Sequence, residues 1–258
     1  MNKEYAIRLI DVKKSFGPQQ VLNGVNLSIE TGKTTVIVGE SGQGKSVIIK
    51  LILGLAKPDS GEIIVDGADI NKISRKELRN VRTSFGVLFQ NVALFDSMTV
   101  FDNVAFPLRE RTGLPEKKIR EIVNEKLAMM DVEGSDDKYP AQLSGGMKKR
   151  VGLARALVLD PKIVFFDEPT TGLDPAKSNE IYRVFFRSQS QIGYTSVIVS
   201  HDAPKIFKLA DYVALLHKGT IQDCVTPEEF QMSENPVIKD YVKTTMGSLF
   251  ISEKMEGE

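Results

Sequence analysis

Short apolar runs alternate along the chain with longer segments that carry a single apolar face. Runs rich in β-branched or aromatic residues are typical of short buried strands. Such strands are predicted at residues 34–38, 85–90, 162–168 and 195–200. Helices are predicted at 45–55, at 74–81 and from about residue 175 onward. Because the strands alternate with helices, we expect a largely parallel sheet.

The beginning and the middle of the chain depart from this alternation. Residues 5–12 and 21–29 predict two strands joined by a turn at 16–20, and a further strand follows at 62–67. The middle of the chain is helical, with helices predicted at 99–110, 115–130 and 144–159. The expected fold class is therefore α/β: a core with a mostly parallel sheet, an N-terminal antiparallel β subdomain and a helical insertion at about 91–160.

Composition limits the classes of partner. The chain has 258 residues, enough for one large α/β domain, and its 34 basic and 34 acidic residues cancel. This balance argues against a nucleic-acid partner. The single cysteine, Cys224, cannot form an internal disulfide and fits a reducing compartment. The longest apolar stretch, residues 47–56, is interrupted by Lys50 and is too short to span a bilayer, so we expect any membrane role to require a partner.

A glycine-rich stretch, "GESGQGKS" at residues 39–46, lies between a predicted strand and a predicted helix. Backbone N–H groups at a helix start form an anion site, and glycine lets them turn toward one phosphate. The spacing matches a nucleotide phosphate loop, in which the lysine reaches the β- and γ-phosphates and the following hydroxyl binds Mg²⁺. The predicted contacts are Gly39, Ser41, Gly42, Gly44, Lys45 and Ser46.

Two neighbouring carboxylates end the apolar run "KIVFF". Asp167 and Glu168 are therefore predicted at the carboxyl edge of the sheet, where ligands of α/β folds collect. Asp167 can hold Mg²⁺, and Glu168 can polarise an attacking water. Adjacent acidic residues are common on surfaces, so this pair gains its meaning from the phosphate loop.

A second anion site is predicted at "LSGGM", residues 143–147. Ser144 is a good N-cap, and the N–H groups of Gly145 and Gly146 would be free at a helix start. One nucleotide does not need two such sites from the same molecule. The pair makes sense if two subunits share each nucleotide, and a plain helix cap is the alternative.

The order of these motifs resembles the nucleotide-binding subunits of ATP-binding cassette (ABC) transporters, from about Ala6 to Tyr241. In addition to the stretches above, the glutamine loop of that family matches Gln90, its dimer-contacting loop matches residues 171–174, and its switch histidine matches His201. The aromatic residue that stacks on adenine matches Phe16.

This resemblance implies an ATPase that binds ATP and Mg²⁺ and works as a homodimer enclosing two ATP molecules. It implies Ser46, Gln90 and Asp167 as metal contacts, and Glu168, His201, Lys45 and Gln90 as the residues of the hydrolytic reaction. It also implies that Phe16, the phosphate loop, Ser144, Gly145, Gly146 and Asp174 contact the nucleotide, with Asp174 acting across the dimer. A stacking contact by Phe16 would contribute roughly 1–3 kcal/mol, and a surface aromatic is the alternative.

Two segments are most similar in sequence to the Mla-type, Mce-associated phospholipid transport ATPases. They are "LFDSMTVFDNVAFPLRE" and "LSGGMKKRVGLARAL", and the second includes Met147. That similarity implies attachment to the cytoplasmic face of the inner membrane through transmembrane permease subunits. An Mce-domain protein and a small cytoplasmic regulator are further implied partners. Apolar residues after Gln90, such as Phe95, would line the groove for the permease, although core packing explains some of them.

Several alternatives stay open at this point. A methionine-type small-solute importer has a similar groove. A soluble cassette ATPase usually has two cassettes or long coiled coils, and a P-loop kinase would leave "LSGGM" and "TGLD" without a role. We expect residues 1–243 to form a single domain and 244–258 a C-terminal tail. The apolar residues Met246, Leu249, Phe250 and Ile251 of that tail either dock on the second subunit or belong to a frayed end.

Overall fold

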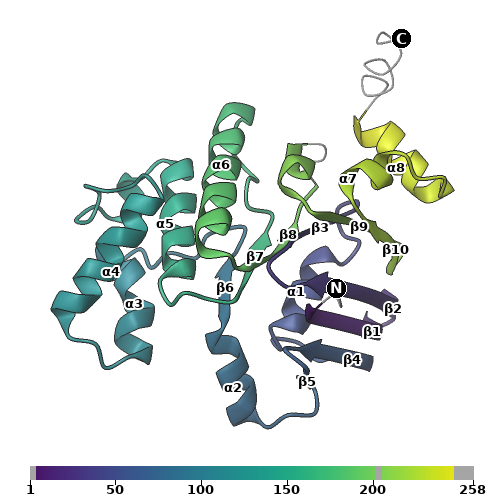
Figure 1. Cartoon of the computed structure of the whole chain (residues 1–258), viewed down its shortest axis with the longest axis horizontal. Coiled ribbons are helices and arrows are strands. Elements are labelled where there is room, and N and C mark those ends of the chain that lie inside the picture. Colours follow the sequence, from purple (N-terminus) through teal and green to yellow (C-terminus); the bar gives the residue numbers. More distant parts are fainter. Residues whose placement is uncertain (1–3, 202–204, 247–258) are drawn as a thin grey trace. The chain divides into compact units, whose positions relative to one another are not determined.

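The computed structural model describes residues 4–201 and 205–246. The chain forms two compact units, of which unit 1 comprises residues 1–73 and 198–258, and unit 2 comprises residues 74–197 (Figure 1). The assignment of residues 1–243 to a single domain stays a prediction.

Unit 1 contains an antiparallel sheet with the strand order β2-β1-β4-β5. Its strands are β1 (Tyr5–Phe16), β2 (Gln19–Glu30), β4 (Ser60–Val65) and β5 (Ala68–Asp69). Alternation places Ile7, Leu9 and Ile29 in the core, while Arg8 and its register partner Ser28 are exposed. β1 and β2 run further than the predicted strands, because cross-strand pairing continues to Phe16 and Gln19 and leaves only Gly17 and Pro18 for the turn.

Unit 1 also contains three further paired strands, in the order β10-β9-β3. They are β3 (Thr34–Val38), β9 (Tyr212–His217) and β10 (Thr220–Val225). β3 is parallel to β9, and both are apolar because both of their faces are covered. The remaining elements of this unit are α1 (Lys45–Ile52), the 3-10 helix η2 (Lys205–Leu209), α7 (Pro227–Gln231) and α8 (Pro236–Met246).

Unit 2 contains the predicted helical region and the strand that carries the two carboxylates. Its helices are α2 (Arg75–Thr83), α3 (Val100–Arg111), α4 (Glu116–Met129), the 3-10 helix η1 (Pro140–Gln142), α5 (Gly145–Leu157) and α6 (Pro175–Ile192). Its strands are β6 (Phe85–Leu88), β7 (Ile163–Asp167) and the first part of β8 (Thr195–Val199), in the order β8-β7-β6. β6 and β7 are parallel.

Helix starts in unit 2 follow from the sequence. Ser74 accepts a hydrogen bond from the Glu77 N–H in a capping box, and the Thr99, Ser144 and Asp174 side chains each accept one from a backbone N–H in the first turn of their helix. Helices α3, α4 and α5 pack against one another, as Figure 1 shows. Their contact faces bury apolar residues such as Val104, Val123 and Val151.

The predicted α/β class is confirmed, including the antiparallel strands and the helices at 99–110, 115–130 and 144–159. Helices α7 and α8 are additional elements that the sequence analysis did not predict. Part of the predicted tail, residues 244–246, completes α8, and the rest of it lies outside the described residues. Within the two described ranges, every helix is too short or too polar to cross a bilayer.

Candidate active site

The glycines of residues 39–46 adopt backbone conformations that other residues avoid. Gly39, Gly42 and Gly44 have φ values of +151°, +81° and +100°. A Cβ on Gly39 would lie 2.4 Å from the Leu216 carbonyl oxygen, and one on Gly44 would lie 2.6 Å from a Val21 methyl group. The loop therefore requires glycine for its conformation and for its close approach to neighbouring backbone.

Lys45 is folded back onto the loop. Its ammonium group donates to the carbonyl oxygens of Gly39 at 2.8 Å and Glu40 at 2.9 Å, and the residue is only 6% exposed. Ser46 follows it in the first turn of α1, which contains no acidic residue. A buried cation and a helix start free of carboxylates form an electropositive cradle suited to phosphate.

The hairpin between β9 and β10 supports the loop from the side. The Lys218 N–H donates to the Gln43 side-chain oxygen at 2.9 Å. A cavity of about 160 Å³ lies beside the loop start, and it is lined by Gly39, Glu40, His201, His217 and residues of α8. The structure thus places His201 in one cavity with the start of the phosphate loop, and it adds His217 and α8 to the same place.

Phe16 ends β1 with its ring half-exposed, at 51%. The Lys14 ammonium lies 5.4 Å from the centre of that ring, a distance suited to a cation–π contact. An exposed ring at this place is available for stacking, so the prediction for Phe16 stays open to test.

Asp167 and Glu168 lie at the end of β7, where the run of buried residues stops. Glu168 has a φ of +50°, a strained conformation for a residue with a side chain. The Thr171 hydroxyl lies 3.4 Å from a Glu168 carboxylate oxygen, at the start of the "TGLD" loop. Strain at a carboxylate that was predicted to be catalytic fits a functional role.

The signature segment and the "TGLD" loop meet within unit 2. A Cβ on Gly145 would lie 3.3 Å from a Leu173 methyl group, whereas none of the described atoms lies within 4 Å of a Cβ on Gly146. Ser144 caps α5 and Asp174 caps α6. The hydrogen bond and the ion pair with Lys177 lower the pKa of Asp174 below its usual value, so this carboxylate is ionised at neutral pH.

Gln90 follows β6 with an exposed side chain, while its carbonyl oxygen accepts a hydrogen bond from the buried Lys149 ammonium at 2.5 Å. Sequence reasoning did not single out Lys149. A signal was present, because Lys149, Leu153 and Leu157 share the four-residue spacing of one buried helix face. A lysine in that row is unusual enough to be noticed.

The predicted residues therefore fall into two groups. Unit 1 holds Phe16, residues 39–46 and His201, and unit 2 holds Gln90, residues 143–147 and residues 167–174.

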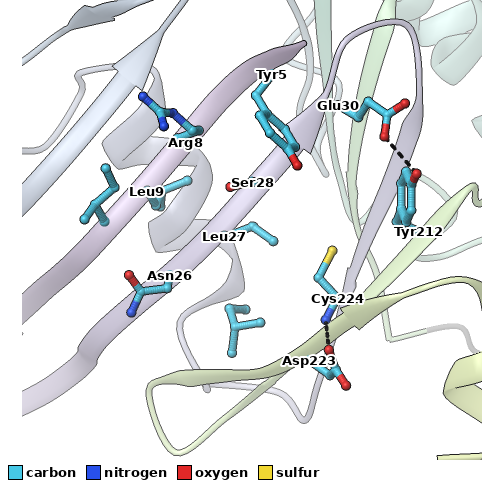
Figure 2. Close-up of a pocket in the computed structure, with 12 residues that line it drawn as sticks. Tyr5, Arg8, Leu9, Asn26, Leu27, Ser28, Glu30, Tyr212, Asp223 and Cys224 are labelled. Atoms are coloured by element: carbon cyan, nitrogen blue, oxygen red, sulfur yellow. Dashed lines mark hydrogen bonds between the residues drawn. The ribbon is translucent and has the colours of Figure 1, made fainter. Parts of the chain in front are cut away.

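A second, larger cavity of about 460 Å³ lies in unit 1 between β1, β2, β9 and β10 (Figure 2). Two of its carboxylates are already engaged: Glu30 accepts from the Tyr212 hydroxyl at 2.8 Å, and Asp223 accepts from the Cys224 N–H at 2.8 Å. Among the described residues that line it, none belongs to the predicted nucleotide site.

The residues predicted to bind the nucleotide have the chemistry that a nucleotide with Mg²⁺ requires. The glycine cradle leaves no room for a Cβ at two positions, Lys45 supplies a cation, and the start of α1 carries no carboxylate that would repel phosphate. The Ser46 hydroxyl of unit 1, and the Gln90 amide oxygen and the Asp167 carboxylate of unit 2, are each hard oxygen donors of the kind that Mg²⁺ prefers.

Comparison with known families decides the class of protein. Residues 22–171 match the family described as ABC transporter, which is more than half of the chain. The chain belongs to the ABC transporter family. As an ABC ATPase it uses ATP, and its predicted fold and enzyme class are confirmed.

Curated relatives of this ABC ATPase carry several transport names. It is 42% identical over 252 residues to a probable ribonucleotide transport ATP-binding protein, mkl, of Mycobacterium bovis, covering 97% of this chain and 70% of that protein. It is 41% identical to the intermembrane phospholipid transport ATP-binding protein MlaF of Haemophilus influenzae, covering 91% of this chain and 90% of MlaF. A methionine import ATP-binding protein, MetN, of Carboxydothermus hydrogenoformans is 40% identical, with 88% of this chain and 67% of MetN covered.

Solved structures agree with the fold of this ABC ATPase. CbiO1 from Clostridium perfringens, part of the cbiONQ complex, superposes with a TM-score of 0.83 at 33% identity, covering 98% of this chain and all of that one. The cassette MJ0796, in a dimeric post-hydrolysis state bound to ADP and Pi, has a TM-score of 0.77 at 31% identity, with 86% of this chain and 98% of that one covered.

Proposed function

We propose that this chain is the ATP-hydrolysing subunit of a transporter that moves phospholipids between two membranes. The observation that supports phospholipid as the cargo is the share of each relative's length that this chain covers. It covers 90% of the phospholipid relative MlaF, but only 70% of mkl and 67% of MetN. A chain that accounts for nearly a whole relative shares its architecture, whereas the other two proteins contain about a third that this chain does not match. Met147 in the signature segment also supports this branch of the family.

The roles of the phosphate-loop residues follow from their chemistry. Lys45 exchanges its two carbonyl partners for the β- and γ-phosphates, and the loop N–H groups hold the phosphate oxygens. Ser46, Gln90 and Asp167 would hold Mg²⁺, which would neutralise phosphate charge when bound. Phe16 stacks on the base.

The hydrolytic step depends on Glu168, which accepts a hydrogen bond from the attacking water and so polarises it. His201 contacts the γ-phosphate and stabilises the position of Glu168. Ser144, Gly145, Gly146 and Asp174 contact the nucleotide held by the second copy of the chain. Two copies therefore close only when ATP bridges them, and closure is a population shift whose free energy comes from contacts that ATP completes.

The membrane partners belong to the same proposal. Transmembrane permease subunits hold the ATPase at the cytoplasmic face of the inner membrane, together with an Mce-domain protein and a small cytoplasmic regulator. Phe95 supports a permease-docking role, because it is 42% exposed and packs against Phe106 at 5.1 Å between ring centres. The exposed Phe95 ring and the partly buried Phe106 ring together form apolar surface of the kind that interaction sites use.

Glu168→Gln tests the mechanism. We expect ATP binding to persist while turnover falls by roughly 10²- to 10⁴-fold, the usual contribution of a positioned general base. The variant should then accumulate as an ATP-dependent dimer, which size-exclusion chromatography with and without ATP detects. Unchanged hydrolysis would remove Glu168 from its role.

The identity of the partners tests the cargo. The tagged protein is extracted from its native membranes in mild detergent, and the copurifying polypeptides and lipids are identified by mass spectrometry. A permease with an Mce-domain protein and bound phospholipid supports the proposal. A permease with a solute-binding protein supports instead a small-solute importer of the methionine type, which the identity to MetN makes the second candidate.

A further inference from the structure

Helix α5 holds residues 90–93, the segment after Gln90 together with Gln90 itself, through three residues on one side of the helix. The Lys149 ammonium donates to the Gln90 carbonyl oxygen at 2.5 Å. One turn further, Gly152 lets the helix approach so closely that a Cβ there would lie 2.3 Å from a Val92 methyl group. Arg155 then donates to the carbonyl oxygens of Val92 and Ala93, both at 2.7 Å.

The segment held in this way is strained. Val92 and Ala93 have φ values of +60° and +52°, in the left-handed region that residues with side chains avoid. Strain of this kind persists only where the surroundings impose it, and it gathers at functional segments. The α5 side chains supply the imposing contacts, because three backbone carbonyls of this segment are bonded to Lys149 and Arg155.

Lys149 differs from the other two holding residues in its burial and in its electrostatics. It is 5% exposed, and its charge is attracted by the Glu168 carboxylate. Burial lowers the pKa of Lys149, and the attraction of Glu168 opposes that shift. A buried lysine is costly unless it is paired, and here the Gln90 carbonyl oxygen accepts its hydrogen bond while the Glu168 carboxylate adds attraction.

We propose that Lys149 is a positioning residue for ATP hydrolysis, which holds the Gln90 backbone in a fixed relation to helix α5 and places a buried positive charge that attracts Glu168. The inference rests on the proposed roles of Gln90 and Glu168. It deepens them in one respect: α5 begins at Ser144, Gly145 and Gly146, the residues proposed to contact the nucleotide of the second copy. Lys149 lies one turn after the start of that helix. It therefore connects the start of α5 to the groups proposed to act on the nucleotide of its own copy.

The coupling has a physical basis in the stiffness of a helix. Lys149 lies four residues after Gly145, so a shift of the α5 start is transmitted to its ammonium group with little loss. That group then moves the Gln90 carbonyl directly and the Glu168 carboxylate through charge. Docking of a second copy would in this way change the position of the Glu168 carboxylate without contacting it.

The test compares four variants of the full-length chain by steady-state ATP hydrolysis. Lys149→Met keeps the length and apolar stem but removes the donor and the charge, and we expect kcat to fall at least about tenfold while KM for ATP is unchanged, since misplacement of reacting groups acts on turnover. Lys149→Arg keeps a charged donor and should recover most of the loss. Lys149→Gln keeps a donor without the charge and should recover only part of it.

Lys148→Met is the matched control, because it removes the same charge one residue away, outside the buried face. It should leave kcat and KM at the wild-type values. Equal kcat for wild type and Lys149→Met would overturn the inference. If Lys149→Met does not fold, as judged by its thermal transition, then Lys149→Gln decides: full activity of a folded Lys149→Gln excludes the charge contact with Glu168.

The two proposals fail in different ways. Hydrolysis that survives in Glu168→Gln contradicts the proposed function of the site. Hydrolysis that survives in Lys149→Met, while Glu168→Gln is inactive, contradicts the positioning role alone. If Lys149→Met shows both a higher KM for ATP and a lower kcat, and Lys149→Arg does not correct them, Lys149 contributes to general stability instead.

Discussion

The phosphate loop in unit 1 and the segment after Gln90 in unit 2 both contain backbone with positive φ, but they reach it by opposite means. In the loop, Gly39, Gly42 and Gly44 adopt these conformations without strain. In the second segment, Val92 and Ala93 adopt them at a cost on the order of 1–2 kcal/mol each. In the loop the residue type permits the conformation, whereas in the second segment contacts from α5 impose it.

The difference explains what each region can do. The glycine loop keeps its shape because Lys45 and Lys218 hydrogen-bond to it, so it presents a formed cradle to phosphate. A strained segment keeps its shape only while Lys149, Gly152 and Arg155 hold it. Its conformation therefore depends on the position of α5, which makes it suited to respond to a change elsewhere.

The largest effect should come from replacing a glycine whose backbone conformation the phosphate loop requires. Gly39→Ala places a Cβ 2.4 Å from the Leu216 carbonyl oxygen at a φ of +151°. The loop must shift and lose N–H contacts to phosphate, so we expect ATP affinity to fall roughly 100-fold, as two charge-assisted hydrogen bonds would predict. Titration with a fluorescent ATP analogue measures it.

Gly17→Ala is the control for that variant. Gly17 also has a positive φ, +58°, but a Cβ there meets none of the described atoms within 4 Å. It should cost about 1 kcal/mol of stability and leave ATP affinity unchanged. Wild-type affinity in Gly39→Ala would show that phosphate binding does not need the observed loop conformation.

A smaller effect is expected where α5 meets the strained segment. Gly152→Ala places a Cβ 2.3 Å from a Val92 methyl group and 2.9 Å from a Leu88 methyl group. We expect a loss of about 1–3 kcal/mol in the free energy of unfolding, because overpacking moves the helix from the segment. ATP affinity should hardly change, since the loop is in the other unit. Urea denaturation provides the measurement.

Gly113→Ala is the comparison variant for Gly152→Ala, because a Cβ at Gly113 has none of the described atoms within 4 Å. Its free energy of unfolding should stay near the wild-type value. The close approach of α5 to Val92 would be in error if Gly152→Ala and Gly113→Ala were equally stable.

The smallest effect should come from relieving strain. Ala93→Gly removes the penalty at a φ of +52° on an exposed residue, so stability should rise by up to about 1 kcal/mol after the greater chain entropy of glycine is subtracted. Ala128→Gly, on the exposed side of α4, should instead lose about 1 kcal/mol. Thermal melting of both variants distinguishes the outcomes, and an equal loss in the two would contradict strain at Ala93.

The sequence by itself determined the alternation of strands and helices, the glycine loop, the carboxylates at the end of β7 and the capped start of α5. Each of these depends on residues adjacent in the chain: β-branched runs, glycines between a strand and a helix, or a serine before a helix. The sequence analysis extended β1 and β2 too little, because strand ends depend on a pairing partner.

Only the tertiary structure decided which distant residues act on these motifs. The Lys149 ammonium reaches the Gln90 carbonyl across 59 positions, and the Lys218 N–H reaches Gln43 across 175. Such contacts leave no local pattern, because they arise where packed elements meet and depend on the direction of each side chain. The strain at Val92, Ala93 and Glu168 is hidden for the same reason: none of these residues favours a positive φ, and the surrounding fold imposes it.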